Sequence, residues 1–228
     1  PKLVGAMIQR RRIYEKALPS KDAQKIYVFC EGDDREKNYF DFFSGLSSNL
    51  EVIAITPYNH RSSPNNLMMR AEELFEGETP VYTLDYDQKD IIWFVVDTDE
   101  WEEQGLIKRL RTFCAEKNTG KNYIAWNVAQ SNPSFEIWLY YHIYGTKPND
   151  EDVSSYTSFK EYVNSKISGG FDSGLMPIYI EDAIRNSKAN FTRNGDSPAK
   201  YSTEAYLLGN DIVKYAGKDL QLKKRRLI

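Results

Sequence analysis

Cysteine and histidine are scarce in this chain of 228 residues, which contains two of each. Two cysteines do not make a disulfide framework, and the four residues together are too few to favour a zinc site. Cys30 ends a predicted buried strand and Cys114 falls in a predicted helix, so we expect reduced core thiols in a cytoplasmic protein. No apolar run approaches the roughly 20 residues that cross a bilayer, so we expect no membrane association.

The charge of the chain is unevenly distributed. Residues 1–25 carry seven basic against two acidic side chains, and residues 214–228 carry six against one. Each end is thus about +5, although the whole chain carries −3. These ends are either solvated tails or surfaces that bind a polyanion. The candidate nucleic-acid-binding residues there are Arg10, Arg11, Arg12, Lys223, Lys224, Arg225 and Arg226.

Predicted strands and helices alternate in the first 145 residues, and the hydrophobic content of 41% is that of a globular protein. The predicted strands are 25–30, 50–56, 91–96 and 123–128. The predicted helices are 35–46, 64–77, 103–117 and 133 to about 144. This alternation predicts an α/β fold with a parallel, Rossmann-like sheet of about four strands flanked by helices.

The pattern changes after residue 145, where no convincing strand is predicted. The helical patterns in this part are 156–167, 177–190 and 202–216. We therefore expect three parts: a basic N-terminal extension at 1–24, an α/β domain at 25–145 and a helical C-terminal subdomain at 146–228.

Two of the predicted strands end in carboxylates. Residues 26–30 run into Glu31, and residues 91–96 run into Asp97-Thr98-Asp99. Parallel sheets bind ligands at the carboxyl ends of their strands, so we expect Glu31, Asp97 and Asp99 to converge. Clustered carboxylates repel one another unless they bind a cation, and oxygen ligands suit Mg²⁺ or Mn²⁺ together with phosphates. The pattern indicates phosphoryl chemistry; ordinary acidic loop residues are the alternative.

Further candidates lie in the two helices that follow the first and fourth strands. Glu36 either binds the metal or favours the N-terminus of its helix by charge. Glu136 interrupts an apolar helix, and buried carboxylates are rare unless paired or metal-bound. Asn132 and Pro133 are predicted to be the N-cap and first residue of that helix. His142 is either a proton carrier or a surface or interface histidine.

Three motifs in this order resemble the RloB-like family, over about residues 25–216. They are Cys30-Glu31-Gly32-x-x-x-Glu36-x-x-Tyr39-Phe40, Val95-Val96-Asp97-x-Asp99-Glu100 and Ser131-Asn132-Pro133-x-Phe135-Glu136-x-Trp138-Leu139 with His142. Tyr201-Ser202-Thr203 is also similar to the carboxy-terminal pattern of that family.

The resemblance implies a TOPRIM-like core, the metal-binding fold of topoisomerases, primases and OLD-type nucleases. By it, Glu31 corresponds to the TOPRIM glutamate, and Asp97 and Asp99 to its Asp-x-Asp pair. Genes of the family typically accompany an ATPase gene, often near restriction or phage-defence loci, so an ATPase partner is implied. Arg35 stands where the family usually has threonine. A cation there either contacts phosphate or neutralises part of the cluster, which weakens the case for Glu36 as a ligand.

We therefore expect a Mg²⁺- or Mn²⁺-dependent nuclease subunit of a phage-defence system, acting on DNA or RNA, including tRNA. The candidate catalytic residues are Glu31, Asp97, Asp99 and Glu136, the candidate metal ligands are Glu31, Glu36, Asp97 and Asp99, and Arg35 is a further candidate for binding nucleic acid. Glu31 is alternatively a general acid or base. The alternative function is a non-catalytic or regulatory subunit that binds an ATPase and nucleic acid. A nucleotidyl transferase or primase ranks below both, since no further nucleotide-binding signature is present.

Overall fold

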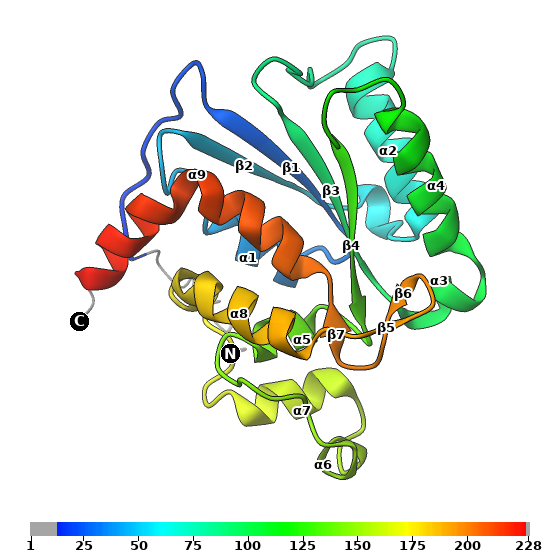
Figure 1. Cartoon of the computed structure of the whole chain (residues 1–228), viewed down its shortest axis with the longest axis vertical. Coiled ribbons are helices and arrows are strands. Elements are labelled where there is room, and N and C mark those ends of the chain that lie inside the picture. Colours follow the sequence, from blue (N-terminus) through cyan, green and yellow to red (C-terminus); the bar gives the residue numbers. More distant parts are fainter. Residues whose placement is uncertain (1–12, 227–228) are drawn as a thin grey trace, which may run out of the picture.

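The centre of the computed structural model is a five-stranded sheet with helices on both faces (Figure 1). The structure describes residues 13–226, apart from the side chains of His60, Asp99 and Glu100. The strand order is β2-β1-β3-β4-β7. The strands are β1 (Gln24–Cys30), β2 (Leu50–Ile55), β3 (Ile91–Asp97), β4 (Trp126–Asn132) and β7 (Ser202–Thr203). The first four are mutually parallel and β7 pairs antiparallel to β4, so the predicted α/β class is confirmed.

The central strands are buried on both faces, which explains their nearly continuous apolar sequences. In β1, Ile26 and Val28 face one core and Tyr27 and Phe29 face the other. The first core is covered by α1 (Arg35–Asp41) and α9 (Ala205–Arg225), and the second by α2 (Pro64–Glu76) and α4 (Leu106–Asn118). The helix α8 (Ile180–Asn190) packs against α9.

A third cluster of buried side chains lies beyond the carboxyl ends of the strands. It contains aromatic and aliphatic residues of α5 (Glu136–Tyr140) and α7 (Phe159–Lys166), joined by Tyr201. The short helix α6 (Asp150–Ser154) precedes α7, and a 3₁₀ turn, η2 (Met176–Tyr179), precedes α8. Figure 1 shows α6 and α7 below the tip of β4. The strand ends are thus faced by helical structure from the second half of the chain.

Two predictions around the fourth strand are wrong. β4 extends to Asn132, because its last residues continue the pairing with β3, in which Asp97 lies opposite Ser131. Asn132 therefore does not cap a helix; its side-chain amide donates to the carbonyl of Pro198 at 2.9 Å. Helix α5 begins only at Glu136 and ends at Tyr140. Strand pairing has overridden a local capping signal here.

The expectation that the last 83 residues contain no strand is also wrong. Besides β7, a hairpin is formed by β5 (Arg193–Asn194) and β6 (Ser197–Pro198). Two-residue strands carry no alternating pattern that a sequence can reveal. Two further short elements follow other strands, η1 (Tyr58–His60) after β2 and α3 (Asp99–Glu103) after β3.

Both cysteines are buried and unpaired, as expected. None of the helices in the described part of the chain has the length and apolar character that crossing a bilayer requires.

Candidate functional site

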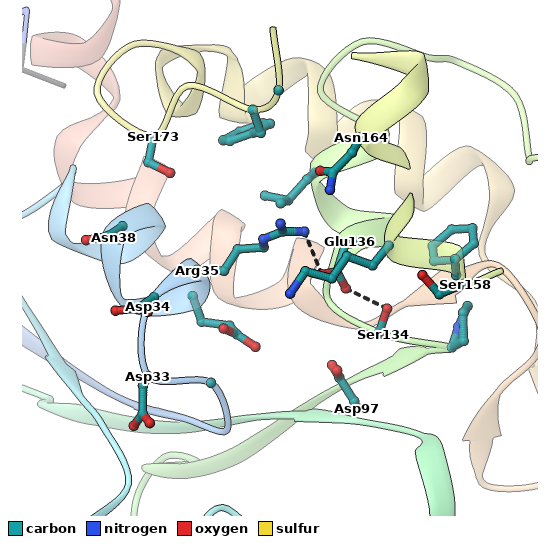
Figure 2. A pocket seen from close by; sticks show the side chains of 18 residues that line it. Asp33, Asp34, Arg35, Asn38, Asp97, Ser134, Glu136, Ser158, Asn164 and Ser173 are labelled. Carbon is teal, nitrogen blue, oxygen red and sulfur yellow. Dashed lines mark hydrogen bonds and ion pairs between the residues drawn. The ribbon is translucent and has the colours of Figure 1, made fainter. Parts of the chain in front are cut away.

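A cavity of about 930 Å³ lies at the carboxyl ends of β1, β3 and β4 (Figure 2). One wall, which we call the floor, comes from the strand ends and the segments that follow them. The floor consists of Gly32, Asp33, Asp34, Arg35, Glu36, Asn38, Asp97, Pro133, Ser134, Glu136 and Leu139. The opposite wall, the roof, consists of Ser158, Phe159, Lys160, Asn164, Gly170, Phe171 and Ser173. Ligands of parallel sheets bind in this position.

Asp97 is the last residue of β3, and its carboxylate lines the floor. Its Oδ1 atom accepts a hydrogen bond from the backbone N–H of Phe135 at 2.8 Å. This bond joins the end of β3 to the segment after β4. Asp97 is therefore held in place by two neighbouring strand ends.

Glu31 follows β1, and its carboxylate bonds to the start of the Asp-x-Asp segment. Oε2 accepts from the backbone N–H of Asp97 at 2.8 Å, and Oε1 accepts from the indole N–H of Trp101 at 2.5 Å. Glu31 is not among the described residues that line the cavity. In this structure it orders the turn that carries Asp97.

Asp99 lies beyond the strand that carries Asp97. β3 ends at Asp97, and Asp99 is the first residue of α3. Its side chain and that of Glu100 are outside the described residues. Among the side chains that are described, no group of three or more histidine, cysteine or acidic residues is arranged to hold a metal ion.

Glu36 is a buried carboxylate on the floor, 7% exposed. Burial raises its pKa, and the nearby Glu136 carboxylate adds to the rise. A Cβ atom on Gly32 would lie 2.1 Å from Oε2 of Glu36, so a larger residue at this position would displace the carboxylate from where it now lies. The raised pKa shows that negative charge is costly here, which a bound cation would relieve.

Glu136 is paired rather than isolated. Its Oε1 atom lies 2.6 Å from Nη1 of Arg35, and its Oε2 atom accepts from the hydroxyl of Ser134 at 2.6 Å (Figure 2). The ion pair connects α1 to α5 across the floor. Arg35 is thus a floor cation, and its pairing explains how a carboxylate is tolerated in this apolar helix.

The basic end of the chain does not line this cavity. Lys223, Lys224 and Arg225 form the last turn of α9, and Arg226 caps it. Lys224 lies 3.3 Å from Asp182, and the ammonium of Lys223 lies 4.7 Å from the ring centre of Tyr14. Lys223 and Lys224 thus contact neighbouring parts of the structure, whereas Arg225 and Arg226 are exposed. Arg10, Arg11 and Arg12 fall outside the described residues.

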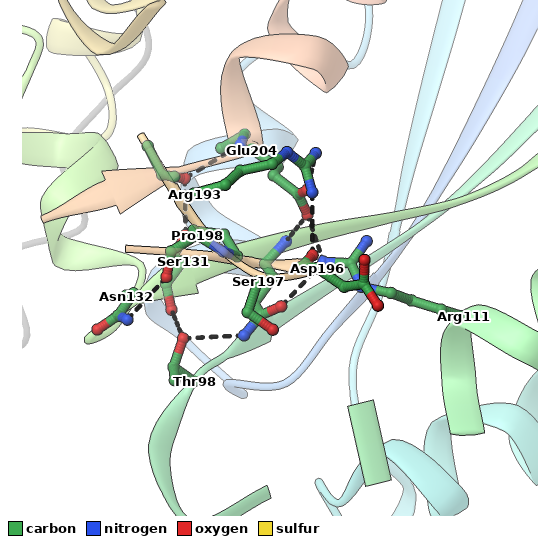
Figure 3. Close-up of polar contacts among 12 residues, drawn as sticks. Thr98, Arg111, Ser131, Asn132, Arg193, Asp196, Ser197, Pro198 and Glu204 are labelled. Atoms are coloured by element: carbon green, nitrogen blue, oxygen red, sulfur yellow. Dashed lines mark hydrogen bonds and ion pairs between the residues drawn. The ribbon is translucent and has the colours of Figure 1, made fainter. Parts of the chain in front are cut away.

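A polar network that we did not predict from the sequence lies beside the turn at Asp97 (Figure 3). Glu204, only 1% exposed, accepts hydrogen bonds from Arg111 at 2.7 Å and from Arg193 at 2.8 Å. The side-chain amide of Gln130 donates to the hydroxyl of Thr98 at 3.1 Å and to Glu102 at 2.9 Å. The contacts of Glu204 and those of Gln130 form one network, because Arg111 also donates to the side chain of Gln130 and the backbone N–H of Gln130 donates to Glu204.

This network fixes the segment between the two aspartates of the Asp-x-Asp pair. Thr98 donates its hydroxyl to the carbonyl of Ser131 at 2.8 Å, and the β5–β6 hairpin reaches Glu102 through Ser197. Gln130 lies beyond the predicted end of the fourth strand at residue 128, so the sequence did not identify it as a buried polar side chain in need of partners.

His142 is buried, so its interpretation as a surface or interface residue is wrong. Its Nε2 atom lies 3.1 Å from the hydroxyl of Tyr39, and Nδ1 lies 3.0 Å from the carbonyl of Trp138. Burial lowers its pKa from 6.5 to about 4. It is not among the described residues that line the cavity, so the structure gives it a packing role.

Acid should destabilise the protein through His142. The unfolded chain binds this proton with a pKa near 6.5 and the folded chain only near 4, so stability is lost as pH falls between these values. We expect the free energy of unfolding to drop by about 2 kcal/mol from pH 7.5 to pH 5 on account of this residue. Urea unfolding of the wild type and of His142→Asn at both pH values isolates the effect. An identical pH dependence of the two proteins would contradict it.

The sequence profile of the RloB-like protein family matches residues 26–212. No curated protein and no solved structure matches the chain significantly.

Proposed function

The chain belongs to the RloB-like protein family, and on that basis we propose that it is a Mg²⁺- or Mn²⁺-dependent nuclease subunit with a TOPRIM-like core. The observation that carries the proposal is the floor of the cavity. Five carboxylates line it at the carboxyl ends of parallel strands, among them Glu36, Asp97 and Glu136. Hard oxygen donors of this kind suit Mg²⁺ or Mn²⁺.

Asp97 and Glu36 are the floor residues proposed to hold the metal, together with Asp99 at the start of α3. When bound, the metal would polarise the scissile phosphate and lower the pKa of a water nucleophile. Glu31 acts as a positioning residue, because its two hydrogen bonds set the turn that presents Asp97.

Arg35 is proposed to bind a phosphate oxygen of the substrate. It is 29% exposed at the floor, and its planar guanidinium can contact Glu136 and a phosphate through different N–H groups. Glu136, held by Arg35 and Ser134, would then accept the proton of the attacking water. In this proposal both members of the ion pair take part in the reaction, because Arg35 binds the substrate and Glu136 acts as the general base.

The family resemblance supports the wider setting of this proposal, a phage-defence system with an ATPase partner. It also leaves open the alternative of a regulatory subunit that binds nucleic acid and the ATPase without cutting.

Glu31→Gln tests the proposal. Glutamine keeps the oxygen that accepts from Asp97 but replaces the other with an amide that clashes with the donor on Trp101, so the Asp97 turn should shift. We expect cleavage to fall by roughly tenfold to a hundredfold, the cost of a misplaced catalytic group. Supercoiled plasmid, single-stranded DNA and total tRNA are incubated with wild type or variant in Mn²⁺, Mg²⁺ or EDTA. Cleavage at the wild-type rate by Glu31→Gln would argue against this positioning role. If the wild type cleaves nothing with any metal, alone or with the ATPase, the regulatory subunit is favoured.

A further inference from the structure

The roof of the cavity differs in chemistry from the floor. The floor carries carboxylates, whereas the roof carries hydroxyl and amide groups, two aromatic rings and one lysine. Figure 2 shows Ser158, Asn164 and Ser173 across the cavity from Asp97. The scissile phosphate of the proposed reaction would therefore lie between two walls and not on an open surface.

Lys160 is the cation of the roof, in the first turn of α7, and it is exposed. Among the described lining residues, Arg35 and Lys160 are the two cations. With Arg35 on the floor, Lys160 is the cation placed to contact a phosphate on the roof side.

The two roof aromatics are backed by other rings. Phe159 stacks on Tyr201 with ring centres 5.5 Å apart, and Phe171 meets the ring of His142 at 5.1 Å. Both phenylalanines are half-buried and line the cavity. Rings held in this way present a fixed aromatic surface to the cavity, against which a nucleobase can pack.

We infer that the cavity takes an unpaired nucleotide strand, of RNA or DNA, and excludes a double helix. The inference rests on the proposed function and names its substrate class. A volume of about 930 Å³ is that of a small-ligand site, which a few nucleotides fill. In a duplex the bases are paired between two backbones, so they reach aromatic side chains only when they are extruded. An unpaired strand brings its phosphate to the floor and a base to Phe159 or Phe171 at the same time.

Binding measurements test this inference separately from cleavage. A fluorescein-labelled 20-nucleotide strand, as RNA and as DNA, is titrated with the protein alone and after annealing to its complement, in Ca²⁺ buffer. We expect the unpaired strands to bind at least about tenfold more tightly than the duplexes, since stacking contributes about 1–3 kcal/mol per base. Lys160→Ala should weaken strand binding about threefold to tenfold, and Phe159→Leu should weaken it by a similar factor.

Lys121→Ala is the matched control, because Lys121 is an exposed lysine in the loop before β4, at the other end of the sheet. Equal affinities for strand and duplex would overturn the inference. So would a loss of affinity in Lys160→Ala no larger than in Lys121→Ala. If the unpaired strands bind selectively but no metal supports cleavage, the inference stands and the proposed nuclease activity fails.

Discussion

Asp97→Asn should abolish metal-dependent cleavage and leave the fold intact. Asparagine keeps an oxygen that can accept from the N–H of Phe135, so the contact between the ends of β3 and β4 survives. It removes the negative charge that a divalent ion requires at the floor. We expect the cleavage rate to fall at least a hundredfold, which corresponds to a loss of about 3 kcal/mol of transition-state stabilisation.

A metal-binding readout accompanies the rate measurement. Binding to the folded state alone raises stability by linkage, so Mn²⁺ should raise the melting temperature of the wild type and not that of Asp97→Asn. The control is Asp87→Asn, an exposed carboxylate in the loop before β3. It should cleave and respond to Mn²⁺ like the wild type. An Asp97→Asn protein that cleaves normally would remove Asp97 from the site, and a wild type indifferent to Mn²⁺ would favour the regulatory alternative.

Glu204→Leu should be the most destabilising single change outside the apolar core. Leucine has a similar volume but leaves Arg111 and Arg193 without their acceptor, and it orphans the backbone N–H of Gln130. Breaking a fully buried ion pair costs about 3–5 kcal/mol. Both arginines are partly exposed, and water can solvate them, so we expect about 2–3 kcal/mol here.

Urea unfolding measures this loss, with Glu73→Leu as the control. Glu73 forms an ion pair with Arg70 at the surface and is 66% exposed. Its replacement should cost no more than about 0.5 kcal/mol, as for other exposed pairs. Similar destabilisation by the two substitutions would show that the network around Glu204 adds nothing beyond a surface pair.

The central strands and the position of the cavity could be read from sequence with good accuracy. β1, β2 and β3 lie within one residue of their predicted bounds, because a strand buried on both faces needs an apolar residue at nearly every position. The order of strands and carboxylates then placed Asp97 at the ligand-binding edge. The periodicity of α2 and α4 was readable for the same reason, since each buries one stripe against the sheet.

Other features depend on contacts between residues far apart in the chain. The partners of Glu136 and Glu204 lie 101 and 93 residues away, at Arg35 and Arg111, and no local pattern connects them. The roof of the cavity, with Lys160, comes from the part of the chain after residue 145, for which the sequence predicted helices and no site residue. The start of α5 was predicted at residue 133 but lies at Glu136, because the pairing of β4 with β3 extends the strand to Asn132.

The sequence by itself therefore determined the fold class, the family and the strand end that carries Asp97, because each depends on the local order of apolar and acidic residues. Only the tertiary structure decided which carboxylates share a cavity, which cations neutralise them and what faces them from the other side. Charges and hydrogen bonds act over a few ångströms in space, and those distances are set by packing, not by separation along the chain.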